Sequence, residues 1–505
     1  MIAIVFYLAI VVIIGAVYSR KTKNVGDFYL GGRKLGPLVT AMSAEASDMS
    51  SWLLMGLPGV AYLTGVADAG WTAIGLAIGT YFNWLIVAKR LRNYSSQIDA
   101  ITIPDYFSQR YRDEKKILMA IAALVIIIFF VPYTASGFAA CGKLFGTLFG
   151  IDYHIAMVVS AVVIVGYTTL GGFNAASTTD FMQSIVMTVA LFIVLIFGVI
   201  SAGGIGAVID NAAALPGYMG LTDIYNPETG EAASYSALTI VSTMAWGLGY
   251  FGMPHILLRF MAIENPRKIT LSRRVATVWV VISMAVAVFI GVVGLGMVNN
   301  TQVLEPLADS ETIIIRIATL LSQKGAFFSI LAGTILAGIL ASTMSTADSQ
   351  LLAASSSASE NLLGGLFKLK LSETSKMVVA RVTLILISVV GVILAWDSNS
   401  NVFKIVSFAW AGFGASFGPV MLLSLFWKRS NKYGAIFGML TGGAMVFIWK
   451  FIIAAKVGGI LAIYELLPAF ICGLVVNIIV SLITKKPDDE IVTEFEQVQD
   501  MSKAN

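Results

Sequence analysis

Serine and threonine side chains recur on one helical face between residues 342 and 349. Ser342, Ser345, Thr346 and Ser349 are spaced i, i+3, i+4 and i+7 in the stretch ILASTMSTADSQLL, and Asp348 lies at the edge of that face. Hydroxyl oxygens beside a carboxylate suit a small hard cation and do not suit a soft metal. In a membrane helix the same stripe also arises from packing, with each hydroxyl bonded to a carbonyl one turn back.

Two apolar stretches are interrupted in ways that weaken a helix. Residues 38–64 contain the polar segment SAEASDMSS followed by Pro58, and residues 235–256 contain three glycines and Pro254 within eight residues. Glycine and proline weaken the backbone hydrogen-bond ladder, and an unpaired carbonyl in lipid is costly. Freed carbonyl groups would bind a hard cation, and freed N–H groups would bind a carboxylate.

Acidic residues inside apolar stretches are the next candidates, because a charge at membrane depth is costly and is usually functional. They are Glu45, Asp48, Asp180 and Asp348. Asp48 lies in the interrupted segment and is the strongest of the four. Asp180 begins an apolar stretch, so it would serve equally well as a helix cap. Trp246 and Tyr250 flank the second interruption at i and i+4, which indicates a pocket wall.

The composition places these residues in a membrane protein. The chain has 505 residues, of which 57% are hydrophobic before its 47 glycines are counted, and only 12% are charged. A soluble domain is about 25% charged. The net charge of +4 gives no reason to expect a nucleic-acid partner, and two isolated histidines with two distant cysteines give no metal or disulfide framework. No obligate protein partner is evident, and the lipid bilayer is the expected surroundings.

Apolar stretches long enough to cross about 30 Å of hydrocarbon predict thirteen transmembrane helices in an all-α fold. They cover residues 2–18, 38–64, 70–88, 117–147, 155–171, 181–202, 235–256, 275–298, 326–352, 377–396, 402–427, 433–455 and 463–484. We expect a single transmembrane domain over 1–484 and a polar, loosely attached tail over 485–505. The longest loop has about 32 residues by this division, too few for a soluble catalytic module, so the chain is not expected to be an enzyme.

Lysine and arginine are concentrated in the odd-numbered connections, including Arg259 after the seventh span. The long connection 203–234 contains acidic residues and no lysine or arginine. Basic loops stay on the cytoplasmic side of a membrane. We therefore expect the N-terminus outside and the C-terminus in the cytoplasm of a multi-pass protein of the cell membrane.

The two interrupted spans, the second and the seventh, run in opposite directions across the membrane. This arrangement is typical of an inverted repeat, here spans 2–6 repeated by spans 7–11, with a binding site at mid-membrane. The alternative is two kinked helices that pack through small residues.

Several motifs resemble the sodium/solute symporter family, in order and over nearly the whole chain. They are NVGDFYLGGRKLG, SAEASDMSSWLLMGLPG, PYTASG, WGLGYFGMPHIL, MSTADSQLL and FAWAGFGASFGPV. The resemblance implies a leucine-transporter-type 5+5 inverted-repeat core that imports proline, a small-molecule substrate, together with the coupling ion Na⁺.

The resemblance also implies roles for individual residues. Sodium would bind the carbonyls of Ala46, Met49 and Ser342 and the hydroxyls of Ser345 and Thr346. A second sodium would involve Asp180, Asp348 and Ser349. The substrate would lie near Ser50, Trp52, Tyr133, Trp246, Tyr250 and Pro254. Asp48 would support the ion indirectly, and Arg33 would link a cytoplasmic loop to coupling.

The chain departs from the family pattern at two positions beside the implied pocket. Glu45 replaces an expected small residue, and Ser51 replaces an expected glycine. Two kinds of alternative therefore remain. The coupling ion could be a proton, taken up by Glu45 or Asp348, and the substrate could be another small amino acid or a carboxylate such as pantothenate. A channel would need a continuous polar pore, and a membrane enzyme would need a base beside a nucleophile. Neither pattern is found.

Overall fold

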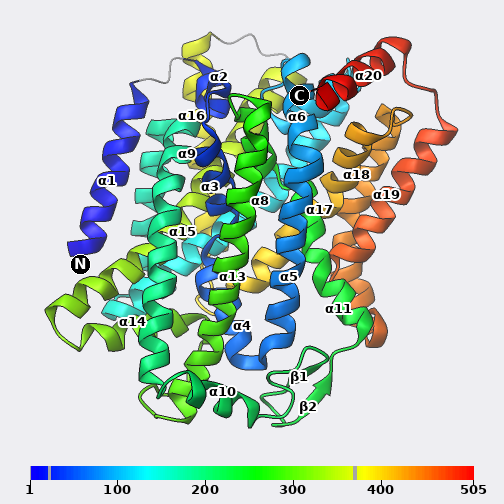
Figure 1. Cartoon of the computed structure of the whole chain (residues 1–505). Helices are drawn as coiled ribbons and strands as arrows, with labels where there is room; N and C mark the ends of the chain where they lie inside the picture. Colours follow the sequence, from blue (N-terminus) through cyan, green and yellow to red (C-terminus); the bar gives the residue numbers. More distant parts are fainter. Residues whose placement is uncertain (1, 21–23, 368–371, 505) are drawn as a thin grey trace.

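The computed structural model describes residues 2–20, 24–367 and 372–504, and these are almost entirely helical (Figure 1). Ten helices of the described chain are long and apolar enough to cross a membrane. They are α1 (Ile2–Ser19), α5 (Val66–Phe82) continued by α6 (Ala88–Gln97), α8 (Ile117–Phe149), α9 (Tyr153–Ser201), α13 (Ile269–Asn299), α15 (Ala326–Ser356), α16 (Glu373–Leu394), α17 (Val402–Phe426), α18 (Lys432–Ile448) and α19 (Leu466–Ile483). The protein is therefore a multi-pass membrane protein.

Both interrupted stretches of the sequence are broken helices in the structure. The first consists of α3 (Pro37–Asp48), a π-helical turn over Trp52–Gly56 and α4 (Leu57–Thr64). The second consists of α11 (Ala237–Met244), a 3₁₀ segment over Ala245–Phe251 and α12 (Pro254–Ala262). Further π-helical turns extend α5 over Asn83–Val87, α15 over Ser357–Leu366 and α18 over Trp449–Ala454.

Short elements cover the two ends of the bundle. At the lower end in Figure 1 lie α10 (Ile205–Ala213) and a small hairpin of β1 (Asp223–Tyr225) and β2 (Ala232–Ser234). At the upper end lie α2 (Val25–Leu30), α7 (Ile103–Arg110) and α20 (Asp489–Ala504), while α14 (Ile313–Ser322) precedes α15. The hairpin is the one exception, within the described chain, to the predicted all-helical fold.

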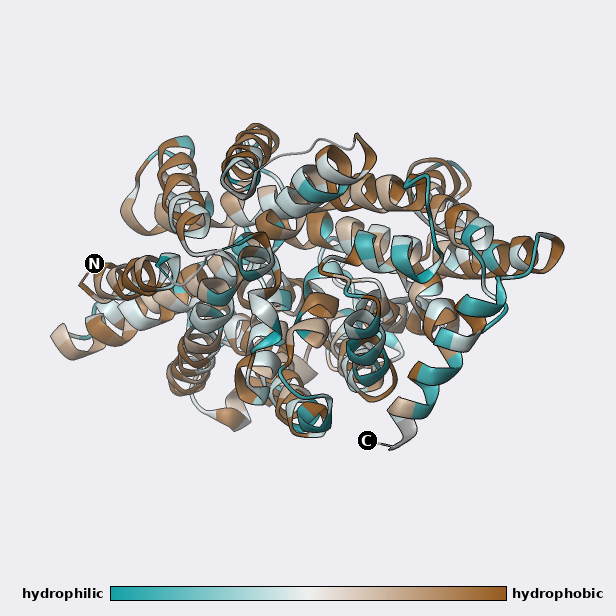
Figure 2. Cartoon of the chain, turned by 90° about the horizontal axis from the view of Figure 1, so that it is seen from above, coloured by the Kyte–Doolittle hydropathy of each residue, from teal (hydrophilic) through white to brown (hydrophobic). Residues whose placement is uncertain are grey.

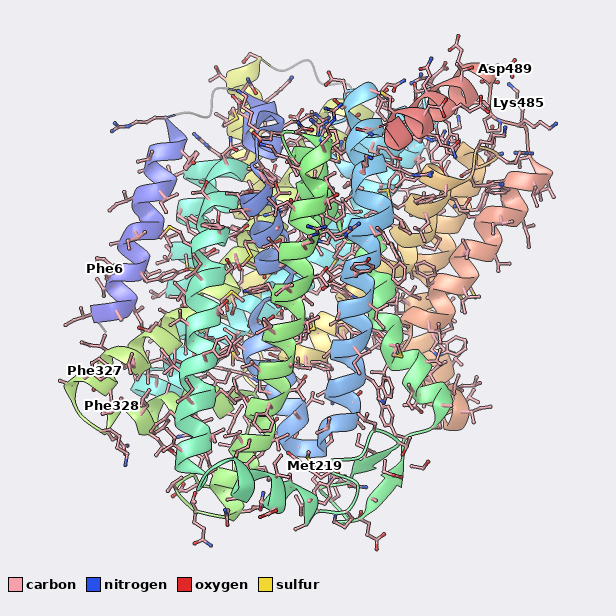
Figure 3. The ribbon with its side chains drawn as sticks, in the orientation of Figure 1. Phe6, Met219, Phe327, Phe328, Lys485 and Asp489 are labelled. Atoms are coloured by element: carbon pink, nitrogen blue, oxygen red, sulfur yellow. The ribbon has the colours of Figure 1, made fainter. Side chains whose placement is uncertain are left out.

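Apolar side chains face outward around the bundle, as a lipid-facing surface requires. Viewed from above, hydrophobic residues colour the outer helices, whereas the helix that ends at the C-terminus is largely hydrophilic (Figure 2). Phe6, Phe327 and Phe328 project from one side of the bundle, and Lys485 and Asp489 lie at one end of it (Figure 3). The helices most completely enclosed by others are α8, α15 and α17.

The fifth and sixth predicted spans, 155–171 and 181–202, lie within the single helix α9. At Gly172 this helix has φ 64° and ψ −163°, which is outside the helical region. A β-carbon at Gly172 would lie 2.7 Å from the Phe28 ring, so both the backbone angle and the close approach require glycine here.

The expectation of a loosely attached tail is wrong. Residues Asp489–Ala504 form α20, which packs on α6. Its apolar face buries Ile491, Phe495 and Val498, and Arg112 forms an ion pair of 2.5 Å with Glu494. The tail is helical because these apolar residues recur at i, i+4 and i+7, which gives the segment one face to bury.

Candidate sodium and substrate site

The break in α3 exposes backbone oxygen atoms inside the bundle. The helix stops at Met49, which has φ −77° and ψ 66°. The amide of Ser50 then donates to Asp48 O at 2.8 Å instead of to Ala46 O, which a continued helix would use. The carbonyl of Ala46 is thereby free to face another helix.

The serine stripe of α15 meets this free carbonyl. Ser345 Oγ donates to Ala46 O at 2.7 Å, and Ser342 O accepts from Ser345 Oγ at 3.1 Å and from Thr346 Oγ1 at 3.2 Å. Four of the five predicted sodium ligands are therefore in one buried group that joins α3 to α15. The fifth, Met49, is the buried residue at which α3 ends.

The residues predicted for a second sodium surround a buried arginine. Arg259 Nη2 lies 3.1 Å from Asp180 Oδ2 and donates to Ser349 Oγ at 2.5 Å. Its Nε donates to Ser43 Oγ at 3.1 Å, and Ser43 donates to Asp180 at 2.7 Å. Asp348 joins the group through Ser349 Oγ at 3.1 Å and accepts a hydrogen bond from Tyr167.

The sequence interpretation placed Arg259 in a basic connection, and this is wrong. Arg259 belongs to α12 and is 1% exposed. A buried guanidinium is stable only with partners for its charge and its N–H groups. Asp180, Ser43, Ser349 and the carbonyl of His255 supply them.

Asp48 is the centre of the group of residues predicted to bind substrate. Tyr250 donates to its Oδ2 at 2.5 Å, while Trp52 Nε1 and Tyr133 OH donate to its carbonyl at 3.2 and 3.4 Å. Ser50 Oγ accepts from the amide of Trp52 at 3.3 Å, and Pro254 begins α12 directly after the second break. All of these side chains are buried. The two broken helices therefore meet through Asp48 and Tyr250.

Aromatic rings enclose this region. The Trp246 ring lies 6.0 Å from that of Trp52, 6.2 Å from that of Trp410 and 5.2 Å from that of Tyr464. Trp410 Nε1 donates to Trp246 O at 2.7 Å, and its ring meets that of Tyr250 edge-on.

The sequence interpretation did not select Trp410, although it quoted the motif FAWAGFGASFGPV that contains it. A usable signal was the glycine at position 249. A β-carbon there would lie 1.9 Å from Trp410 Nε1, so Gly249 marks the close approach of this ring.

The two remaining predicted residues lie in different surroundings. Glu45 is buried in α3 and accepts a hydrogen bond from Trp84 Nε1 at 2.9 Å. Arg33 lies at the end of the bundle that carries α2, where it donates to carbonyls of Ser95, Ala100 and Met261. Partial burial lowers the pKa of Arg33 to about 10, so the side chain stays cationic at neutral pH.

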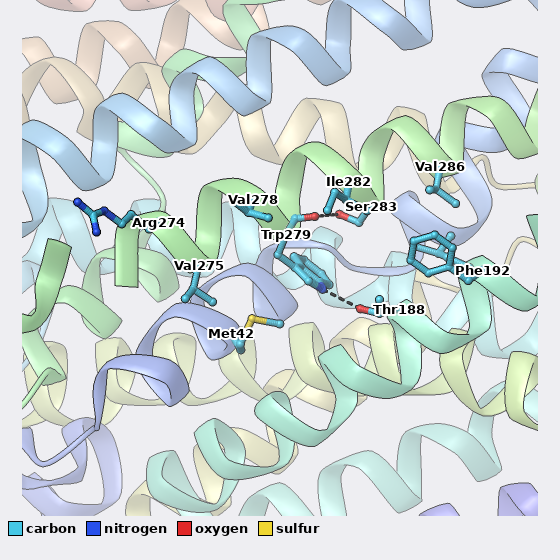
Figure 4. Close-up of a pocket in the computed structure, with 11 residues that line it drawn as sticks. Met42, Thr188, Phe192, Arg274, Val275, Val278, Trp279, Ile282, Ser283 and Val286 are labelled. Carbon is cyan, nitrogen blue, oxygen red and sulfur yellow. Dashed lines mark hydrogen bonds between the residues drawn. The ribbon is translucent and has the colours of Figure 1, made fainter. Parts of the chain in front are cut away.

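A groove on the surface of the bundle is not part of this site. It encloses about 500 Å³ on the outer surface between α3, α9 and α13, where Trp279 donates to Thr188 at 2.8 Å (Figure 4). None of the predicted sodium or substrate residues lines it.

Comparison with known proteins identifies the family of the chain. Residues 28–442 match the sodium:solute symporter family. The chain belongs to the sodium:solute symporter family. It is 41% identical over 489 residues to the high-affinity proline transporter PutP of Bacillus subtilis, covering 97% of this chain and 99% of that one. It is 38% identical to a sodium/proline symporter of Staphylococcus aureus, covering 99% and 96%.

Solved structures of other transporters share the fold of this symporter-family chain. A Na⁺-coupled sialic acid symporter aligns with a TM-score of 0.78 at 18% identity, covering 96% of this chain and 98% of its own. The transporter MhsT in complex with L-phenylalanine aligns with a TM-score of 0.57 at 12% identity, covering 88% and 98%. Membership of this family makes the chain a transporter and not an enzyme.

Proposed function

We propose that the protein is a sodium-coupled symporter that imports L-proline across the cytoplasmic membrane by alternating access. The observation that carries the proposal is the 2.7 Å hydrogen bond from Ser345 Oγ to Ala46 O. It connects the break in α3 with the serine and threonine face of α15. The relatives named as proline transporters match the chain over almost its whole length, which supports proline as the substrate.

Sodium would bind in the buried group between α3 and α15. The proposed ligands are the carbonyls of Ala46, Met49 and Ser342 and the hydroxyls of Ser345 and Thr346. An ion there would replace the mutual hydrogen bonds of these oxygens and order the break in α3. Each positive charge moved into a negative interior gains ~2.3 kcal/mol per 100 mV, which corresponds to about fiftyfold accumulation of a neutral substrate.

The substrate would lie between the two broken helices. Its apolar ring would contact the aromatic side chains, and its polar groups would meet the backbone at the breaks; the proposed contacts are Ser50, Trp52, Tyr133, Trp246, Tyr250 and Pro254. Asp48 would couple the two ligands, because it follows Ala46 on α3 and accepts the Tyr250 hydroxyl from the other broken helix. Arg33, at the end of the bundle, and Glu45 are the other proposed coupling residues.

The resemblance implies a second sodium site at Asp180, Asp348 and Ser349. We propose that the guanidinium of Arg259 provides the positive charge at this site in place of a sodium ion. The guanidinium contacts Asp180 and Ser349 directly. A second sodium would bind these three residues only after Arg259 moves away from them.

Thirteen crossings follow if the two broken helices each cross once and α9 crosses twice. At 1.5 Å per residue a helix of this length would extend roughly 75 Å, far beyond one bilayer, and Gly172 gives the turning point. An inverted repeat of spans 2–6 and 7–11 is consistent with the breaks in the second and seventh spans.

The acidic connection 203–234 favours an external N-terminus and a cytoplasmic C-terminus. Residues 1–484 would be one transport domain with the tail 485–505 on its cytoplasmic side.

Uptake of labelled proline into liposomes containing the purified protein tests the proposal. We expect accumulation with an inward sodium gradient and none when potassium replaces sodium. Competition by unlabelled amino acids and pantothenate tests the substrate. Proline uptake that is driven by a pH gradient without sodium would favour a proton-coupled carrier. Absence of proline uptake would favour a carrier for another substrate.

A further inference from the structure

Two buried carboxylates lie one turn apart on α3 without a basic partner in the described chain. Glu45 is 1% exposed and Asp48 is fully buried. Trp84 binds Glu45 Oε1 and Tyr250 binds Asp48 Oδ2, and both donors are neutral. The other oxygen of each carboxylate, Glu45 Oε2 and Asp48 Oδ1, has no hydrogen-bond partner among the described residues.

Three other buried acids of the bundle are paired with a basic residue, whereas Asp348 accepts hydrogen bonds from Tyr167 and Ser349 and Asp113 accepts one from the amide of Leu118. Asp180 pairs with Arg259, Glu311 with Lys143 at 2.8 Å, and Glu465 with Lys450 at 3.0 Å. An uncompensated charge at membrane depth is expensive, so unpaired acids there mark sites that take a cation from outside the chain.

Two further polar side chains, on α5 and its π-helical turn, contact Tyr250, the residue that donates to Asp48. The Thr80 hydroxyl, 1% exposed, lies within hydrogen-bonding reach of the Tyr250 phenol. Asn83 donates through Nδ2 to Tyr250 O at 3.0 Å, which leaves its Oδ1 without a partner. Asn83 begins the π-helical turn that also carries Trp84, and such turns are frequent at functional sites.

The chemistry of these atoms distinguishes a metal ion from a proton. Protons on the two carboxylates would neutralise them, but each carboxyl O–H group would satisfy only one acceptor oxygen. A hard cation takes several oxygen ligands at once, from carboxylate, hydroxyl and amide groups alike. The set of Glu45, Asp48, Thr80 and Asn83 contains oxygen atoms of all three kinds.

We infer that Glu45 and Asp48, with Thr80 beside them, bind a sodium ion of their own between α3 and α5. This inference rests on the proposed sodium-coupled transport. The site is separate from the proposed ion at Ser345, because Glu45 contacts the α5 side of α3 whereas Ala46 O faces α15. It is also separate from the group of Asp180, Asp348 and Ser349, which contacts Arg259.

Equilibrium binding of ²²Na⁺ to the purified protein counts the sites directly. Because Arg259 contacts Asp180 and Ser349 and blocks the group of Asp180, Asp348 and Ser349, we expect two sodium ions per protein in the wild type and one in Glu45→Gln. The matched control is Glu465→Gln, which removes a buried carboxylate already paired with a lysine and should leave two. Thr80→Val, which keeps both charges, should weaken one of the two sites at least fivefold and leave the other unchanged.

Sodium-dependent proline uptake in liposomes provides the second readout. The Hill coefficient for sodium should fall from near two to near one in Glu45→Gln. A wild type that binds one sodium, a Glu45→Gln protein that retains two, or a second charge carried by a proton would each overturn the inference. Absence of sodium-dependent uptake by the wild type would instead overturn the proposed function.

Discussion

Arg259 Nη2 lies 3.1 Å from Asp180 Oδ2, and neither side chain is more than 1% exposed. This ion pair joins α12 of the second broken helix to α9, and Ser43 of the first broken helix bonds to both partners. Three elements of the proposed transport core are therefore held together by one buried charge pair.

Replacing Arg259 with methionine should destabilise the protein strongly, because Asp180 would keep a buried charge without a partner. Breaking such a pair costs about 3–5 kcal/mol. Thermal unfolding in detergent should show a large fall in Tm, and the double variant Arg259→Met/Asp180→Asn should recover part of it. Arg112→Met, which breaks the partly exposed pair with Glu494, should cost less than about 1 kcal/mol. Equal effects of the two single variants would contradict this account.

Removing the Ser345 or Thr346 hydroxyl should weaken sodium dependence. A lost contact to a charged partner costs about 1.5–3 kcal/mol, so the sodium concentration for half-maximal uptake should rise roughly 10- to 100-fold. Thr343→Ala is the matched control, since that hydroxyl donates within its own helix to Ile339 O. If Thr343→Ala shifted sodium dependence as much as Ser345→Ala, the proposed ligand face would be wrong.

Trp410→Phe should raise the proline concentration for half-maximal uptake about fivefold while sodium dependence stays nearly constant. The change removes the 2.7 Å hydrogen bond to Trp246 O and leaves an aromatic ring in place. A net hydrogen bond contributes about 1 kcal/mol. Trp396→Phe, at a 54% exposed position, should change neither constant. Uptake measured over a range of proline and sodium concentrations gives both half-maximal concentrations. A change in the half-maximal sodium concentration alone would count against a substrate role for the Trp410 ring.

Phe495→Asp should release α20 from the bundle, because a charge would replace an apolar ring that is 5% exposed. Limited proteolysis should then cut faster between residues 485 and 488, which mass spectrometry can locate. Thr493→Ala changes an exposed residue of the same helix and should leave the cleavage rate unchanged. Cleavage of both variants at the wild-type rate would mean that the Phe495 contact does not hold the helix.

Local sequence signals were sufficient for much of the fold and for the hydroxyl-bearing face of α15. Glycine and proline weaken a helix, so the interruptions near Pro58 and Pro254 could be predicted from the sequence, although Pro132 and Pro419 lie inside the continuous helices α8 and α17. The spacing of Ser342, Ser345 and Thr346 likewise fixes one helical face, and the structure brings that face to the break in α3.

Contacts between distant segments could not be predicted in this way. The burial of Arg259 depends on Asp180, 79 residues away in the sequence, and a basic residue near a span end is otherwise typical of a loop. Trp410 packs on Trp246, which lies 164 residues away in the sequence. The tail differs, because the spacing of Ile491, Phe495 and Val498 did contain a helical signal.

The ring-to-ring packing of Trp52, Trp246 and Trp410 gives the protein an intrinsic optical reporter. Three of its nine tryptophans lie together at the proposed substrate site, and a fourth, Trp84, is bonded to Glu45. Any ligand that separates these rings or changes the charge beside Trp84 will alter the ultraviolet emission. Ligand arrival can therefore be followed in unlabelled protein, on the timescale of a stopped-flow experiment.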